Sequence, residues 1–110
     1  MTRIATRRLA VLATQLNGAA DSGRFDHITT DTVTRELAGG DIFGLLTQEL
    51  GGDLDLSKLT DVERHQLAQL WAEYAKWYEA RQFHVKRNGL ALLVAYLLHV
   101  IQIQDSVVPR

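Results

Sequence analysis

The chain contains no cysteine, which excludes disulfide bonds, a thiolate nucleophile and a cysteine-ligated zinc site. It has a single proline among 110 residues and no low-complexity segment. It also lacks an apolar run of the roughly 20 residues that cross a bilayer, because the greasiest stretch, residues 90–103, is interrupted by His99 and Gln102. We therefore expect one soluble domain spanning 1–110, cytoplasmic and without membrane contact.

Signatures of catalysis are missing as well. The sequence has no glycine-rich phosphate loop, no HExxH motif, no nucleophile elbow and no EF-hand spacing. Asp61 and His65 are spaced i, i+4 and could share a metal, but two ligands make a weak site, and a surface pair on a helix is the preferred interpretation. We expect no catalytic residue, no metal and no cofactor, and leave a helical metalloenzyme as a minor alternative.

The net charge of −1 conceals an uneven distribution. Residues 1–20 carry three cations and no acid, residues 21–63 carry ten acids and three cations, and residues 64–110 carry six cations and three acids. Basic ends around an acidic middle favour a surface with two partners of different character, although an ordinary soluble protein can show the same pattern.

The first half of the chain predicts three helices. Residues 3–16 place Ala5, Leu9, Leu12 and Leu16 on one helical stripe, and Asn17-Gly18 should end that helix before a loop over 18–29. Two short helices follow, at 31–38 with Thr30 as N-cap and at 42–50 with Asp41 as N-cap, and each ends at a Gly-Gly pair. The alternating segment 53–59 has no strand to pair with, and we expect it to be an extended connection.

The second half predicts the two longest helices. Thr60 to Glu63, "TDVE", form a capping box that opens a helix over about 61–84. The final helix, about 89–104, is apolar on nearly every side, which is typical of a helix at the centre of a bundle. We therefore predict an all-α fold, a compact bundle of about five helices in which two long C-terminal helices pack with an N-terminal one.

Two segments are candidates for nucleic-acid binding. Residues 30–50 resemble a helix-turn-helix in outline, but "IFGLLTQEL" has no cation to meet DNA phosphates, so we do not favour it. The more suggestive place is the basic elbow at residues 81–89. Its cations and the amide groups of the next helix N-terminus could clamp a phosphate backbone, or the cations could simply offset the helix dipole. The candidate nucleic-acid-binding residues are Arg81, Lys86, Arg87 and Asn88, with Arg3, Arg7 and Arg8 extending the patch if the first helix packs alongside.

The elbow also resembles a known family. Tyr74 and Tyr78 in an aromatic-bearing helix, the branched Val85, then Asn88-Gly89-Leu90 and Ala95-Tyr96-Leu97 are similar to a stretch of the small helical subunit of type III-B CRISPR effector complexes. The similarity covers about 25 residues. The family's Leu-Pro pair is replaced by Arg81-Gln82, which suits a divergent small subunit such as one from a type IV system.

This resemblance implies a non-catalytic subunit of an antiviral, RNA-guided ribonucleoprotein complex. Its partners would be backbone subunits, guide RNA, target nucleic acid and copies of itself, and it would contact phosphates and shape rather than sequence. The alternative is a small protein-binding module, such as an immunity protein, an antitoxin or a phage inhibitor. Such a module would use the acidic region 21–63 to cover a basic partner.

Overall fold

The computed structural model describes residues 4–52, 54–80 and 88–106, with side chains described for 4–52, 54–76 and 88–104. These ranges form five helices and no strand, which confirms the predicted all-α bundle. The helices are α1 (Thr6–Ser22), α2 (Thr30–Gly39), α3 (Ile42–Leu50), α4 (Asp61–Ala80) and α5 (Gly89–Ser106). No helix of the described chain combines the length and the apolarity that crossing a membrane requires.

The first helix is longer than predicted. The expectation that Asn17-Gly18 would end it is wrong, because α1 continues to Ser22 and ends at Gly23, whose φ of 78° is the left-handed conformation of a helix C-cap. Ala19 and Ala20 are buried in the last turns, whereas Asn17 and Gly18 lie on the exposed side. Burial of this alanine pair explains why the helix passes through two residues that favour a stop.

The starts of the middle helices follow the predicted capping rules. Asp41 caps α3 by accepting a hydrogen bond from the Gly44 N–H at 2.9 Å. The capping box of α4 is present, with the Thr60 N–H donating to Glu63 at 2.9 Å and the Glu63 N–H donating to Thr60 at 3.1 Å. For α2 the N-cap is Thr29 rather than the predicted Thr30. The predicted end of α4, residues 81–84, lies outside the described residues.

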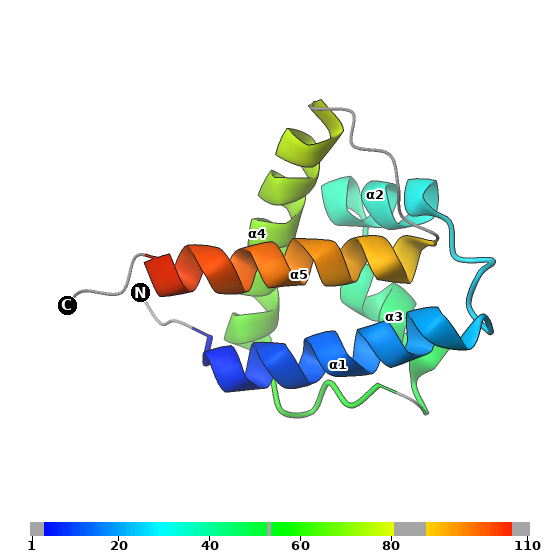
Figure 1. The fold of residues 1–110 in the computed structure, drawn as a ribbon, viewed down its shortest axis with the longest axis horizontal. Helices are drawn as coiled ribbons and strands as arrows, with labels where there is room; N and C mark the ends of the chain where they lie inside the picture. The colour runs from blue at the N-terminus through cyan, green and yellow to red at the C-terminus, as the bar shows by residue number, and fades with distance from the viewer. Residues whose placement is uncertain (1–3, 53, 81–87, 107–110) are drawn as a thin grey trace.

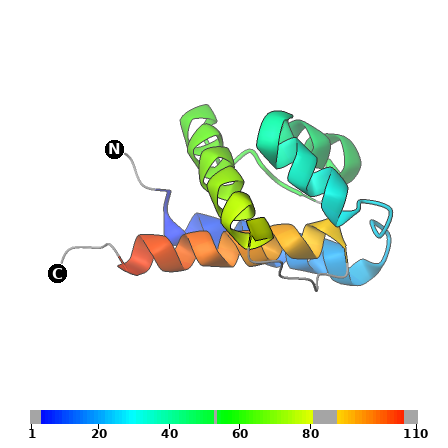
Figure 2. The same cartoon turned by 90° about the horizontal axis from the view of Figure 1, so that it is seen from above.

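The helices form two layers (Figures 1 and 2). One layer is the antiparallel pair of α1 and α5, and the other contains α2, α3 and α4, with α4 crossing α5. Two hydrogen bonds fix the register of the pair: Gln104 Nε2 donates to the Ile4 carbonyl at 2.9 Å, and Asn88 Nδ2 donates to the Ala20 carbonyl at 3.4 Å. The start of α1 therefore lies beside the end of α5, and the end of α1 beside its start.

The core lies between the two layers. Trp71 of α4 is fully buried and stacks on Phe43 of α3, with ring centroids 5.5 Å apart. Tyr74 meets Tyr96 edge-on at 5.2 Å and stacks on His99 at 3.9 Å. His99 is half-buried, so it lies at the margin of the core.

A helix at the centre of a bundle would be covered on every side, but the apolar helix α5 is not. It packs against α1, α2 and α4 through residues such as Leu93 and Leu97, which are fully buried. Leu98, the next residue, is 51% exposed. The prediction of a central helix is correct for three sides of α5 and wrong for the fourth, because a helix in a two-layer fold keeps one side away from the other layer.

Candidate functional site: a groove between α2, α3 and α4

The corner that begins α5 was the first candidate for nucleic-acid contact. Asn88 is only 1% exposed there. Its Oδ1 accepts a hydrogen bond from the Ala91 N–H at 2.9 Å and caps α5, and its Nδ2 donates to Asp26 Oδ1 at 2.7 Å. Together with the bond to Ala20, these contacts join α5 to the end of α1 and the segment that follows it. Both polar ends of Asn88 are thus used within the fold.

Gly89 serves the same corner. Its N–H donates to the Ile28 carbonyl at 2.8 Å. A Cβ on Gly89 would collide with the Val33 side chain and lie 2.6 Å from the Thr29 carbonyl, so only glycine permits this approach. Leu90 is fully buried as well. The Gly89 and Ala91 amide groups thus bond within the protein. The cations of the predicted phosphate clamp, Arg81, Lys86 and Arg87, lie outside the described residues, so the clamp stays a prediction.

The structure places two of the predicted cations, Arg7 and Arg8. Arg3, Arg81, Lys86 and Arg87 lie outside the described residues. Arg7 is exposed near the start of α1, and the antiparallel register places it at the far end of α5 from Asn88. About 13 residues of helix, roughly 20 Å, separate the two levels. Contrary to the expectation, α1 does not bring its first arginines to the Asn88 corner.

Arg8 has a structural contact. Its Nη1 lies 2.9 and 3.0 Å from the two carboxylate oxygens of Glu63, whose side chain is buried. The Thr60 N–H is the main cause that lowers the pKa of Glu63, burial opposes that effect, and Arg8 adds to the lowering. The pair therefore ties α1 to the capping box of α4, a role that the sequence pattern did not indicate.

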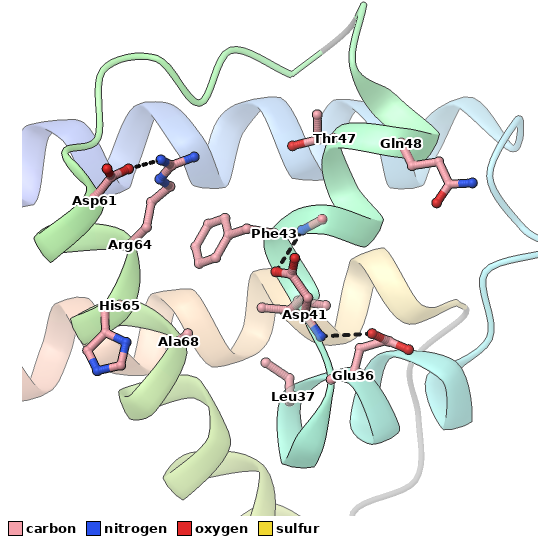
Figure 3. Close-up of a pocket in the computed structure, with 13 residues that line it drawn as sticks. Glu36, Leu37, Asp41, Phe43, Thr47, Gln48, Asp61, Arg64, His65 and Ala68 are labelled. Carbon is pink, nitrogen blue, oxygen red and sulfur yellow. Dashed lines mark hydrogen bonds and ion pairs between the residues drawn. The ribbon is translucent and has the colours of Figure 1, made fainter.

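A groove of about 670 Å³ opens between α2, α3 and the first turns of α4 (Figure 3). Leu37, Phe43 and Ala68, all buried or half-buried, form its apolar lining. Phe43 reaches toward α4 from the first turn of α3, which Asp41 caps. The start of α3 and the shape of the groove therefore both depend on Asp41 and Phe43.

Carboxylates from three elements line the same groove. Glu36 belongs to α2, Asp41 precedes α3 and Asp61 begins α4. Glu36 Oε2 accepts the Asp41 N–H at 3.0 Å, which holds the end of α2 against the start of α3. Arg64, whose guanidinium pairs with Asp61, is the cation among the described lining residues, so the groove keeps an excess of negative charge.

Asp61 and His65, the pair that the sequence suggested as metal ligands, have no third ligand beside them among the described residues. Asp61 and His65 both line the groove, but Asp61 is paired with Arg64. Within the part of the chain that the structure describes, no group of three or more His, Cys, Asp or Glu side chains could hold a metal ion. The arrangement is suited to contact with a cationic, partly apolar surface.

Sequence reasoning did not find this groove. Asp41 and the Gly39-Gly40 pair were interpreted only as helix boundaries, and Phe43 was not singled out. The available signal was the acidic character of residues 21–63, which places Glu36, Asp41 and Asp61 in one segment. Their convergence depends on how α2, α3 and α4 pack, which composition does not show.

No protein-family model, no curated protein and no solved structure matches the chain.

Proposed function

We propose that the chain is a non-catalytic protein-binding module whose groove receives a basic, partly apolar segment of a partner protein. The observation that carries this proposal is the excess of carboxylates around an apolar lining. Three acids converge from separate elements, and their only charged counterweight among the described lining residues is Arg64. The proposal uses the acidic middle region for a basic partner, as the second sequence hypothesis suggested.

The chemistry of the groove indicates which side chains it would receive. Lysine and arginine combine an aliphatic stem with a terminal cation, so the stem can lie on Leu37 and Phe43 while the cation meets Glu36 or Asp41. Exposed ion pairs contribute little energy by themselves. Affinity would therefore come from apolar contact, and the carboxylates would mainly select for a basic segment.

A peptide selection tests the proposal. A random-sequence peptide library displayed on phage is selected on the wild-type chain and on Thr47→Arg, which adds a cation at an exposed position in the groove lining. We expect the wild type to enrich peptides that combine Lys or Arg with apolar residues, and Thr47→Arg to bind them at least tenfold more weakly. Ala10→Arg, an equal charge change on the exposed side of α1, should bind them as the wild type does.

Tryptophan fluorescence gives an independent readout of where such a peptide binds. Trp71 stacks on Phe43 of the groove, and Trp77→Phe leaves Trp71 as the only tryptophan in the chain. Peptide binding in the groove should change the Trp71 emission. Failure to enrich basic peptides, or equal binding to the wild type and Thr47→Arg, would refute the proposal.

A second candidate is the small subunit of an RNA-guided complex, which the family resemblance implies. The observation in its favour is that Asn88-Gly89-Leu90, the most recognisable part of the resemblance, forms a buried junction. Buried residues that join helices determine the fold, so we expect proteins with the same fold to have such residues in common. In this candidate, nucleic-acid contact is assigned to Arg81, Lys86 and Arg87.

An RNA titration distinguishes the two candidates. The subunit function predicts sequence-independent binding of short single-stranded RNA that weakens as salt is raised. Alanine at Arg81, Lys86 and Arg87 should weaken it further, whereas Arg35→Ala on α2 should have little effect. Absence of RNA affinity, both alone and with CRISPR backbone subunits, would end this candidate and leave the groove proposal standing.

A further inference from the structure

The chain contains two asparagines, and a glycine follows each of them: Asn17-Gly18 and Asn88-Gly89. Asparagine before glycine is the pair in which a side-chain amide reacts most readily with the backbone, because glycine has no Cβ to block the approach. The two pairs have different surroundings. Asn17 and Gly18 are exposed on α1, whereas Asn88 is 1% exposed and Gly89 is buried at the start of α5.

The reaction of such a pair is deamidation. The glycine backbone nitrogen attacks Cγ of the asparagine, so an N–Cγ bond forms and the Cγ–Nδ2 bond breaks. Ammonia leaves with the proton of the backbone N–H, and a succinimide ring remains. Water then opens the ring at one of its two carbonyl groups and gives aspartate or isoaspartate. Water is the only co-reactant, and a carboxylate replaces the amide.

The folded corner holds the reacting groups away from each other. The Gly89 N–H donates to the Ile28 carbonyl at 2.8 Å, so this nitrogen is not free to attack. Asn88 Oδ1 accepts the Ala91 N–H at 2.9 Å, and Nδ2 donates to Asp26 Oδ1 at 2.7 Å. Attack requires Cγ to turn toward the Gly89 nitrogen, which breaks these bonds. The reaction at Asn88 therefore requires local opening of the start of α5.

The product does not fit the same corner. An aspartate at position 88 can still accept the Ala91 N–H, but its second oxygen takes the place of Nδ2, the donor that lies 2.7 Å from Asp26 Oδ1. Two carboxylates at that distance repel each other, and the Ala20 carbonyl would also face an acceptor. Isoaspartate adds one carbon to the main chain directly before the buried Gly89.

We propose that Asn88-Gly89 is a self-modification site, at which deamidation proceeds only when the start of α5 opens and the product prevents the corner from closing as before. The modification runs in one direction, so it converts a transient opening of the contact between α5 and residues 20–28 into a lasting one. Neither the groove nor its partner takes part in this reaction.

The exposed pair provides an internal comparison. Asn17 lies on the open side of α1, and nothing lies within 4 Å of the Cβ position of Gly18. A carboxylate at position 17 would stand in water, where the fold tolerates it. Deamidation of Asn17 should therefore leave the structure intact, whereas deamidation of Asn88 should not.

The first test measures the rate at each asparagine. The intact chain is incubated at mildly alkaline pH in buffer and in rising concentrations of urea, and peptide mass spectrometry follows the conversion of amide to carboxylate. We expect both asparagines to react in the unfolded chain. In the folded chain Asn88 should react at least tenfold more slowly than in the unfolded one, and its rate should rise as urea opens the corner.

The second test separates local opening from global unfolding. Asp26→Ala removes the acceptor of the Asn88 amide and should raise the ratio of the Asn88 rate to the Asn17 rate several-fold in the folded chain. Global unfolding exposes both asparagines, so this ratio reports on the corner. Glu73→Ala is the matched control, because it removes an exposed carboxylate on α4 and should leave the ratio unchanged.

The third test examines the product. Asn88→Asp should lower the midpoint of urea denaturation, whereas Asn17→Asp should leave it near that of the wild type. Asp26→Asn in the Asn88→Asp chain places an amide opposite the new carboxylate, so the double variant should recover most of the lost stability.

Five results would overturn the proposal. They are an Asn88 that stays unmodified even in the unfolded chain, equal Asn88 rates in the folded and unfolded chain, and an Asp26→Ala chain with an unchanged rate ratio. The others are an Asn88→Asp chain as stable as Asn17→Asp, and a double variant no more stable than Asn88→Asp alone.

Discussion

The two ends of one short segment, residues 88–98, behave in opposite ways. At its start, Asn88 and Gly89 are polar or small and are buried, and their hydrogen-bonding groups contact residues 20–28. Ten residues on, Leu98 is large and apolar and is 51% exposed. Polarity would suggest the reverse. In this segment the polar and small residues hold the helices together, and a large apolar residue remains in solvent.

Gly89→Ala should have the largest effect on this comparison. The added Cβ would meet the Thr29 carbonyl at 2.6 Å and the Val33 side chain, and a backbone oxygen cannot rotate away. We expect a loss of about 3 kcal/mol in the free energy of unfolding, measured by urea denaturation. Gly18→Ala is the control, because nothing lies within 4 Å of its Cβ position and alanine in a helix should add about 0.5–1 kcal/mol. Equal effects of the two changes would contradict the close approach.

Asn88→Ala should have the next largest effect. It removes the cap of α5 and leaves Asp26 without its 2.7 Å donor, which should cost about 2 kcal/mol. The same variant should leave any RNA affinity of the chain unchanged, because the side chain is buried. Loss of RNA binding without loss of stability would show that Asn88 is a contact residue instead.

A pH titration examines the polar contact between the two layers, the pair of Arg8 and Glu63. Because the pKa of Glu63 is lowered in the folded state, its stabilising contribution is complete above about pH 4.5 and is lost as the pH falls through the folded-state value. Between neutral pH and pH 3 the wild type should therefore lose more stability than Glu63→Gln does. Parallel pH profiles of the two proteins, recorded by chemical denaturation, would contradict the structural role of Arg8 and Glu63.

Leu98→Ala should have the smallest effect on the fold. It should cost about 0.5 kcal/mol, because Leu98 is already half in solvent. The adjacent Leu97→Ala, at a fully buried position, should cost about 3 kcal/mol. Similar costs would mean that Leu98 is covered as fully as Leu97.

Local signals predicted most of the helices. The caps at Asp41 and Thr60 act within three residues of themselves, so their hydrogen bonds could be expected from the sequence. The end of α1 was misplaced because Asn17-Gly18 is a local stop signal, and burial of Ala19 and Ala20 by distant residues outweighs it. The groove was also not predicted from the sequence. Its lining comes from three separate elements, and contacts between distant residues give no local signal.

The sequence alone determined that the chain is helical, where α3 and α4 begin, and that α5 must bury most of its length. These features depend on hydrogen bonds and periodicity within a few residues. Only the tertiary structure decided which side of α5 stays open, and that Asn88 contacts Asp26, which is 62 residues away in the chain. The physical reason is that a helix apolar on every side has no preferred inward face until its neighbours have packed against it.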